Sequence, residues 1–179
     1  MNYIFIDSKN DIEKVGIIED DRLVEFYTDA KDDRKQVGNI YRGKVVNVLQ
    51  GMEAAFVDIG EGKNAYLYVK DALPKELMYK NIPIKIDDIV KNGEDIIVQV
   101  LKEPSENKGP KVTTHITLPS RFLVLTPFSH KISVSRKIHG EYEINRLQDI
   151  GKEMQKEDMG VIFRTKASGI EKEALIDEY

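Results

Sequence analysis

Residues 38–70 have the sequence GNIYRGKVVNVLQGMEAAFVDIGEGKNAYLYVK, and this stretch decides the fold that we expect for the 179-residue chain. It contains three segments rich in Val, Ile, Tyr and Phe, which are typical of strands. These segments are residues 39–49, 53–59 and 64–69. Turn-forming residues separate them, Gln50-Gly51 first and then residues 60–63. We therefore predict three short consecutive strands.

Alternation along the second and third strands predicts one apolar face and one mixed face, because successive side chains point to opposite faces of a strand. The apolar face consists of Ala55, Val57 and Ile59 in one strand and Ala65, Leu67 and Val69 in the next. This face fits the interior of a barrel. The opposite face carries Phe56 and Tyr66 beside Asp58 and Asn64, so two aromatic rings occupy positions that the pattern marks as solvent-facing.

An exposed aromatic pair on a small barrel meets the requirement for base stacking. Every base offers a π-face, and each stack is worth ~1–3 kcal/mol. The alternative is that both rings cover a sheet edge or pack under a neighbouring domain, since aromatic residues are common in strands for packing reasons alone. The pattern by itself leaves both interpretations open.

The composition limits the class of protein. Hydrophobic residues make up 41% and charged residues 32%, so the chain can bury a core and stay in solution as one domain or two small ones. There is no cysteine, which excludes disulfides and thiolate metal sites. No apolar run approaches the ~20 residues of a membrane span, and no signal peptide follows Met1. We therefore predict a cytoplasmic protein without a membrane partner.

The net charge is −4, but the basic residues are unevenly distributed. Residues 102–140 hold seven basic residues against two acidic ones, a local balance of +5 that leaves −9 for the rest of the chain. The seven are Lys102, Lys108, Lys111, Arg121, Lys131, Arg136 and Lys137. Phosphate binding depends on nearby charge more than on the total. A solvated basic face without a ligand explains the segment equally well.

Further strands are expected, some before the barrel and some within it. Residues 2–7, 15–18 and 23–27 predict an N-terminal meander. Residues 95–102 and 111–118 predict two more strands, which bring the barrel to about five, the number in an OB-fold. Between them, residues 103–110 predict a flexible turn that presents Lys108, a residue that could equally be an ordinary loop lysine.

A second apolar block begins at Pro119. It predicts strands at residues 121–125, 131–135 and 159–165, and helices at residues 140–155 and 170–179. Earlier in the chain we expect a short helical turn at residues 71–78 and a loop at residues 80–88. In the long helix, Ile144, Leu147, Ile150 and Met154 recur at helical spacing, and Gly151 is a mild weakness. The predicted fold class is α+β and mainly β, a five-stranded barrel flanked by an N-terminal meander and a C-terminal α+β region.

Arg164 and Thr165 are the sharpest polar pair in this second half. A guanidinium can hold a phosphate with two parallel hydrogen bonds, and a neighbouring hydroxyl adds a third donor. At a strand end the pair would make a compact anion site. Judged alone, it is equally well an ordinary surface dipeptide.

Four segments resemble the N-terminal part of the bacterial ribonuclease E/G family of endoribonucleases. They are GNIYRGKV, MEAAFVDIGEGKNAYLYVKD, NKGPKVTTHITLPSRFLVLTP and GVIFRT. The resemblance implies three domains: a partial ribonuclease H-like meander at 1–36, an S1-type OB-fold RNA-binding domain at 37–118, and a truncated 5′-sensor-like region at 119–179. It also implies that Phe56 and Tyr66 stack on bases and that Lys108 contacts RNA.

The resemblance further implies that Arg164 and Thr165 hold a 5′-monophosphate of RNA. Ser120 and Val124 correspond to the rest of that pocket. Ser120 departs from the family, which usually has a glycine at this position. If the contact uses only the backbone amide, the change is tolerable; if the terminal base stacks on that backbone, the side chain crowds it.

The family cleaves RNA with carboxylates and magnesium in a later domain that resembles deoxyribonuclease I, and many members join subunits through zinc bound by cysteines. The resemblance therefore implies no catalytic, metal or cofactor site in this chain, magnesium only in the catalytic domain, and no hydrolytic activity of the chain alone. The implied partners are single-stranded RNA with a 5′-monophosphate, the catalytic portion, or further copies of the chain as a homo-oligomer.

Two other functions remain open at this point. One is a stand-alone OB-fold adaptor that acts by protein contact or general RNA binding, with no nuclease link. The other is a self-sufficient nuclease using Asp7 and Asp58. We disfavour the second, because such metal-dependent chemistry needs several carboxylates that converge from different strands.

Overall fold

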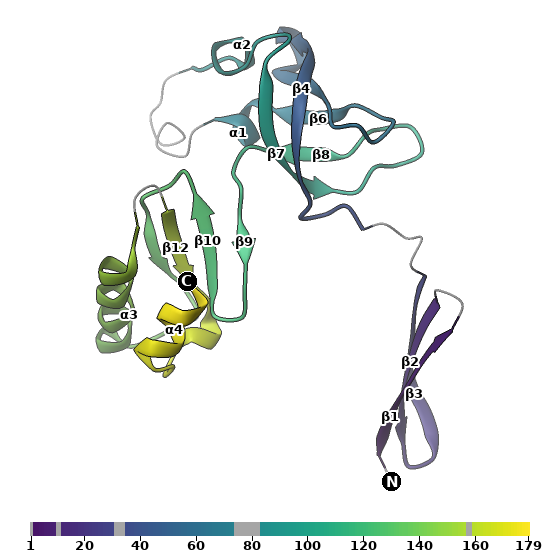
Figure 1. Cartoon of the computed structure of the whole chain (residues 1–179), viewed down its shortest axis with the longest axis vertical. Helices are drawn as coiled ribbons and strands as arrows, with labels where there is room; N and C mark the ends of the chain where they lie inside the picture. The colour runs from purple at the N-terminus through teal and green to yellow at the C-terminus, as the bar shows by residue number, and fades with distance from the viewer. Residues whose placement is uncertain (1, 10–11, 31–34, 74–82, 157–158) are drawn as a thin grey trace. The chain divides into compact units, whose positions relative to one another are not determined.

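A computed structural model describes residues 2–9, 12–30, 35–73, 83–156 and 159–179. The chain is mainly β with few helices, as predicted (Figure 1). It divides into two units, Met1–Gln36 and Val37–Tyr179. The second unit contains two separate hydrophobic cores, one inside a closed barrel and one between a sheet and its helices.

The first unit is an antiparallel meander of β1 (Tyr3–Lys9), β2 (Ile12–Glu19) and β3 (Arg22–Ala30). All three strands extend beyond the predicted segments. The predicted four-residue turn between β2 and β3 shrinks to Asp20 and Asp21, which both have positive φ values, 47° and 61°. A two-residue turn of this hand matches the right-handed twist of the flanking strands, and Asp tolerates the left-handed region.

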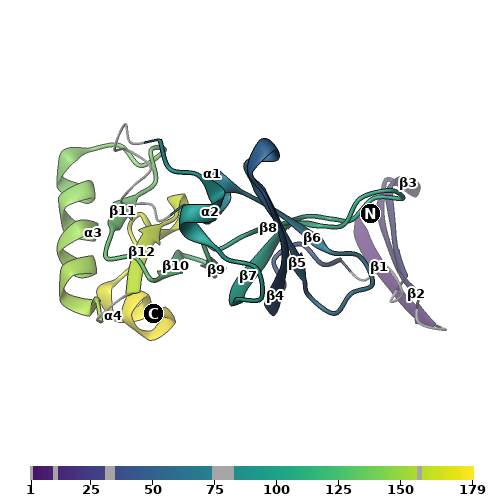
Figure 2. The ribbon, with the colours of Figure 1, turned by 90° about the horizontal axis from the view of Figure 1, so that it is seen from above.

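The barrel is formed by five strands and closes in the order β4-β5-β6-β8-β7 (Figure 2). The strands are β4 (Ile40–Leu49), β5 (Ala54–Asp58), β6 (Ala65–Tyr68), β7 (Asp95–Lys102) and β8 (Lys111–Thr113). All neighbours are antiparallel except β6 and β8, which are parallel. This arrangement confirms the predicted OB-like barrel. The predicted interior face is buried as well, from Ala55 and Val57 to Ala65 and Leu67.

Strand β8 ends at Thr113, five residues before the predicted end of that strand. The following residues turn to helix α1 (Val69–Ala72) instead. Thr113 Oγ1 donates to the carbonyl of Asp71 at 2.7 Å, and His115 Nε2 donates to that of Leu73 at 2.5 Å. Side chains that bond to nearby backbone in this way compete with the sheet ladder. Leu118–Pro119 then forms β9 in a different sheet.

Two short helices lie between strands β6 and β7 in the chain. Helix α1 begins two residues before the predicted helical turn, and residues 74–78 of that prediction lie outside the described residues. Helix α2 (Ile86–Ile89) occupies part of a predicted loop. The side chain of Ile86 is fully buried, and the backbone N–H of Ile86 donates to Glu53 Oε2 at 3.0 Å. Burial of this residue in the barrel core accounts for the extra helical turn.

The C-terminal region is a four-stranded sheet in the order β11-β12-β10-β9, packed against helices (Figure 1). Its elements are β10 (Leu123–Pro127), β11 (Ile132–Val134), α3 (Glu141–Met154), β12 (Met159–Phe163) and α4 (Lys172–Glu178). Helix α3 buries Leu147, Ile150 and Met154, as the helical spacing predicts. A Cβ at Gly151 would lie 2.7 Å from Ile132 Cγ2, so this glycine permits close packing of helix on sheet and is not a weakness.

Candidate nucleic-acid interface

Phe56 and Tyr66 lie directly opposite each other in the register of β5 and β6. Their ring centroids are 6.1 Å apart and the rings are inclined at 64°, an edge-to-face arrangement. Both side chains are half-buried, on the side of the strands that points away from the barrel core. Part of each ring is therefore open to solvent, and the two rings support each other at the surface.

The two rings lie in a groove with a volume of about 700 Å³. The other residues that line it are Met52, Lys102, Glu103, Ser105, Asn107, Lys108, Gly109 and Lys111. They come from the 3-10 turn η1 (Gln50–Met52), the end of β7, the loop 103–110 and the start of β8. In chain order these are the second and third strands of the barrel and the loops after the first and fourth, where OB-folds bind oligonucleotides. The structure thus brings Phe56, Tyr66 and Lys108 together.

The groove carries two lysine ammonium groups that are available to a ligand. Lys111 Nζ pairs with Asp71 Oδ2 at 2.7 Å, so its charge is partly neutralised. Within the described part of the chain, Lys102 and Lys108 have no side-chain hydrogen bond or ion pair. Of the seven basic residues in the segment 102–140, these three line the groove and the other four belong to the region after β9.

Met52 lines the groove although the strand pattern does not indicate it, and backbone hydrogen bonds close part of the loop that carries Lys108. Met52 is 53% exposed and is the last residue of the turn η1, whose sequence gives no signal for ligand contact. In the loop, Ser105 N donates to Lys108 O at 2.9 Å and Lys108 N donates to Ser105 O at 3.2 Å. This pair of backbone bonds closes residues 105–108 into a turn.

Arg164 and Thr165 follow β12 and line a second, shallow hollow of about 380 Å³ together with Ser135, Ile162, Phe163 and Lys166. Thr165 Oγ1 lies 3.0 Å from Ser135 Oγ. The Arg164 guanidinium donates to the carbonyl of Ser120, so these two predicted residues meet. Val124 pairs with Ile162 in the sheet register. Neither Ser120 nor Val124 lines the hollow itself.

Glu178, near the C-terminus of α4, holds the turn that contains Ser120. Its Oε1 accepts hydrogen bonds from Phe122 N at 2.6 Å and Leu123 N at 2.9 Å, and also from the Ser120 hydroxyl. Burial acts to raise the pKa of Glu178, but these bonds and the nearby charge of Arg121 lower it overall. The serine that departs from the family pattern therefore has a defined structural partner, which no local sequence signal indicates.

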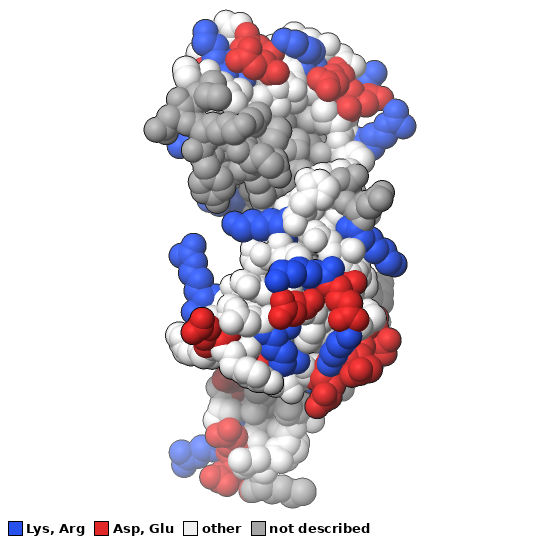
Figure 3. Space-filling view, turned by 90° about the vertical axis from the view of Figure 1, so that its left-hand side faces the viewer, with Lys and Arg blue, Asp and Glu red and all other residues white. Residues whose placement is uncertain are grey.

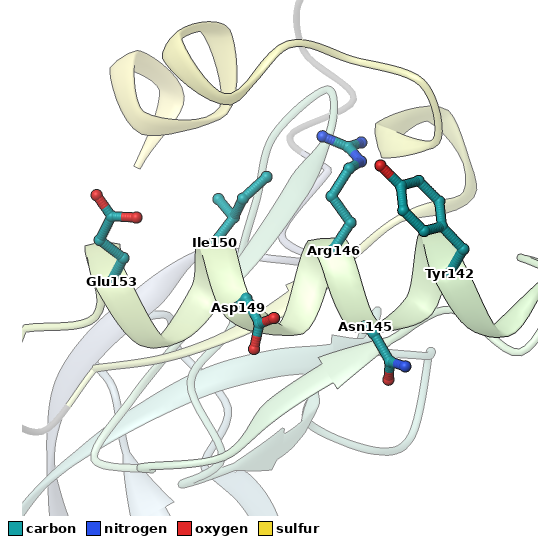
Figure 4. Close-up of a pocket in the computed structure, with 6 residues that line it drawn as sticks. All are labelled: Tyr142, Asn145, Arg146, Asp149, Ile150 and Glu153. Atoms are coloured by element: carbon teal, nitrogen blue, oxygen red, sulfur yellow. The ribbon is translucent and has the colours of Figure 1, made fainter.

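A third hollow lies along one helix and is lined by Tyr142, Asn145, Arg146, Asp149, Ile150 and Glu153 (Figure 4). Its charges are paired within the protein. Arg146 donates to both oxygens of Glu143 at 2.8 and 2.9 Å, and Gly169 N donates to Glu143 Oε1 at 2.9 Å. The Arg146 contact lowers the pKa of Glu143 to about 2. This network joins α3 to the segment before α4 and is structural.

The described residues offer no metal centre. Asp7 lies in the meander opposite Lys14, and Asp58 Oδ1 accepts a hydrogen bond from Gly60 N at 2.9 Å, which caps a turn. No group of three or more His, Asp or Glu side chains that could hold a metal ion is found in the described ranges. The same ranges contain no helix with the length and hydrophobicity of a membrane span.

Surface charge does not single out another interface on the side shown in Figure 3. There, lysines and arginines are interspersed with aspartates and glutamates. Several such pairs are within contact distance, among them Lys172 and Glu153 at 2.6 Å and Lys152 and Asp149 at 2.8 Å. We take the groove and the Arg164 hollow as the two candidate sites.

The barrel and its groove define an OB-like protein with an aromatic and basic groove on one face. Comparison with known sequences identifies related proteins. Residues 117–179 match the model of the Ribonuclease E/G family. The chain is therefore related by sequence to that family, which confirms the resemblance.

The relatives match most of this chain but only part of their own length. Ribonuclease G of Salmonella typhimurium (strain SL1344) is 40% identical over 171 residues, which cover 92% of this chain and 35% of that protein. Ribonuclease E of Nostoc sp. (strain PCC 7120) is 40% identical over 144 residues, which cover 80% of this chain and 21% of that protein. The chain thus spans about a third of the length of the ribonuclease G protein.

Among solved structures, similarity is weak. A chain of the a/eIF2alpha-aDim2p-rRNA complex from Pyrococcus horikoshii OT3 matches with a TM-score of 0.36 and 14% identity, over 46% of this chain and 45% of that one. GSP13 from Bacillus subtilis matches with a TM-score of 0.34 and 24% identity, over 45% of this chain and 54% of that one. Neither similarity bears on the function of this chain.

Proposed function

We propose that this chain binds single-stranded RNA in the groove of the barrel, as part of a ribonuclease E/G-type endoribonuclease acting in RNA processing and decay. One observation carries the proposal: the Phe56–Tyr66 pair lies in one groove with the ammonium groups of Lys102 and Lys108. Bases stack on exposed rings whatever their sequence, and ammonium groups attract the phosphates between them. The ribonuclease G and E relatives support RNA as the ligand.

The test is a fluorescence-anisotropy titration of the chain with a labelled single-stranded RNA, with a duplex of the same sequence as control. We expect tighter binding of the single strand, because paired bases cannot stack on the protein. Chelation of divalent ions should leave the affinity unchanged, since the groove residues need no metal to act. Equal affinity for both RNAs would overturn the proposal.

We further propose that the hollow at Arg164 prefers a 5′-monophosphate. Arg164 and Thr165 supply guanidinium and hydroxyl donors beside Ser135, and Lys166 adds positive charge. The guanidinium already donates to the Ser120 carbonyl, which fixes its orientation and leaves other N–H groups for an anion. Otherwise identical RNAs ending in monophosphate, triphosphate or hydroxyl test this preference. Equal affinity for all three ends, or no effect of Arg164→Ala, would sink it.

A stand-alone adaptor is the competing function. It predicts either no RNA binding or binding without end preference, whereas the favoured proposal predicts strong salt dependence and a preference for one end group. Incubation of end-labelled RNA with the chain and magnesium separates both from a self-sufficient nuclease. We expect no cleavage above the buffer control, and Asp7→Asn and Asp58→Asn would be the variants to examine if cleavage occurred.

We also propose a cytoplasmic location and association with a catalytic portion or with further copies of the chain. Light scattering after size exclusion would test self-association across a range of concentrations. A single monomeric mass at every concentration would remove the homo-oligomer from this proposal and leave the catalytic portion as the partner.

A further inference from the structure

Lys63 lies in the turn between β5 and β6, outside the groove lining, yet its side chain reaches the loop that carries Lys108. Lys63 Nζ donates to the carbonyl of Glu106 at 2.6 Å and to that of Ser105 at 3.1 Å. Lys63 is exposed, but two of its three ammonium N–H donors already have acceptors in the protein.

The hydrogen bonds of Lys63 are connected to Lys108 through the backbone of Ser105. Ser105 exchanges two backbone hydrogen bonds with Lys108, and the Ser105 carbonyl accepts from both Lys108 N and Lys63 Nζ. If Lys63 were removed, the closed turn 105–108 would lose its charged anchor. Charge-assisted hydrogen bonds are roughly twice as strong as neutral ones, so the anchor is substantial.

Two further contacts hold the same loop against the β5–β6 turn. A Cβ at Gly109 would overlap the carbonyl oxygen of Asn64, so only glycine allows the two segments to come this close. Next along the chain, Tyr66 N donates to Pro110 O at 2.8 Å. Contacts from residues 63–66 thus hold the loop in place. This short stretch contains both the aromatic ring of Tyr66 and the ammonium group of Lys63.

We propose that Lys63 is a positioning residue for RNA binding: it fixes the loop so that Lys108 stands beside the Phe56–Tyr66 pair, and it does not itself contact RNA. This inference rests on the proposed function of the groove. A preordered loop loses less conformational entropy when a ligand binds, which raises affinity without a new contact. Lys63 and Lys108 should therefore act as one unit.

A double-mutant cycle tests the inference in the full chain, with Lys63→Met, Lys108→Met and the double variant titrated with single-stranded RNA. We expect Lys63→Met to weaken binding roughly 3- to 10-fold and the double variant to be within about 2-fold of Lys108→Met alone, as coupled residues behave. The slope of log affinity against log salt should fall by about one in both single variants and in the double variant.

Matched controls separate position from charge. Lys63→Arg keeps the charged donor and should retain affinity within about 2-fold of the unchanged chain. Lys91→Met removes the same charge from a lysine that also donates to a backbone carbonyl, that of Asp87, but does not line the groove. It should leave RNA affinity unchanged. A thermal unfolding curve shows whether Lys63→Met is folded. If it is not, Lys63→Gln takes its place in the cycle.

The outcomes distinguish the inference from the function on which it rests. A double variant whose salt slope falls by about two, or whose loss is the product of the single losses, means that Lys63 meets phosphate itself and overturns the inference. Full affinity of Lys63→Met beside a weakened Lys108→Met also overturns it, while the proposed function stands. Full affinity of Lys108→Met and of Phe56→Ala overturns the proposed function.

Discussion

The rings of Phe56 and Tyr66 are inclined at 64° to each other on directly paired positions of neighbouring strands. Because the two faces are far from parallel, one base cannot lie flat on both rings. A base that stacks on one ring meets the other at an angle, in the corner between them. If RNA binds in the groove as proposed, we therefore expect the pair to hold one base rather than two.

Phe56→Ala and Tyr66→Ala should each weaken binding of single-stranded RNA by about 1–3 kcal/mol, the value of a base–aromatic stack. The double variant should lose much less than the sum, because both changes remove the same site. Tyr66→Phe, which keeps the ring, should bind normally. Additive losses in the titrations would instead indicate two separate bases.

The side-chain amide of Gln99 joins the segments that enter and leave the barrel. Its Nε2 donates to Gly38 O at 3.0 Å and to Thr117 O at 2.9 Å, and its Oε1 accepts from Thr117 N at 2.9 Å. Gln99 is itself buried, and Gln99→Leu removes all three of these hydrogen bonds, so it should lower the free energy of unfolding by about 1–3 kcal/mol in urea. Gln50→Leu removes a single exposed hydrogen bond, from Nε2 to Asp87 Oδ2 at 2.6 Å, and should change it by only about 0.5 kcal/mol.

Gly151→Ala should destabilise the chain, although an alanine usually favours a helix over glycine by about 1 kcal/mol. The new methyl group would lie 2.7 Å from Ile132 Cγ2 and 3.1 Å from Phe163 Cε2. Overpacking of a core typically costs about 1–3 kcal/mol, so we expect a lower midpoint of thermal unfolding. Gly51→Ala, with no atom within 4 Å of its Cβ, serves as the control. A higher midpoint for Gly151→Ala would contradict the packing.

Stability should depend on pH through Glu143, whose pKa is lowered from 4.5 to about 2 by its bonds to Arg146. A carboxylate with a lowered pKa in the folded state stabilises that state above the unfolded pKa, and the contribution is lost as the pH falls through the folded one. Glu143→Gln should therefore cost roughly 1–3 kcal/mol at pH 7. The cost should shrink below pH 4.5 and vanish near pH 2.

Urea unfolding at several pH values would measure this effect. Arg146→Met should cause a similar loss at pH 7, and the double variant should lose little more, since both changes break one pair. A cost of Glu143→Gln that stays constant down to pH 2 would show that the side chain contributes by packing rather than by charge.

The faces of the barrel strands followed from the sequence because the side-chain period of a strand is fixed at two. The alternation in residues 54–69 was enough to assign Ala55, Val57 and Leu67 to the interior and Phe56 to the outside, as observed. Helix α3 was equally predictable, because its apolar residues recur at the helical period. Strand ends were less so: β8 stops at Thr113 because side-chain bonds to α1 compete with the ladder.

What the sequence alone determined, then, is periodic: which residues form strands and helices, which faces are buried, and which family the chain resembles. What the tertiary structure decided is contact between segments distant in the chain. Lys63 against Ser105, Glu178 against Phe122 and Arg164 against Ser120 are separated by 42 to 56 residues. No local period encodes such pairs, because they depend on how strands close into a barrel and how a helix end reaches a turn.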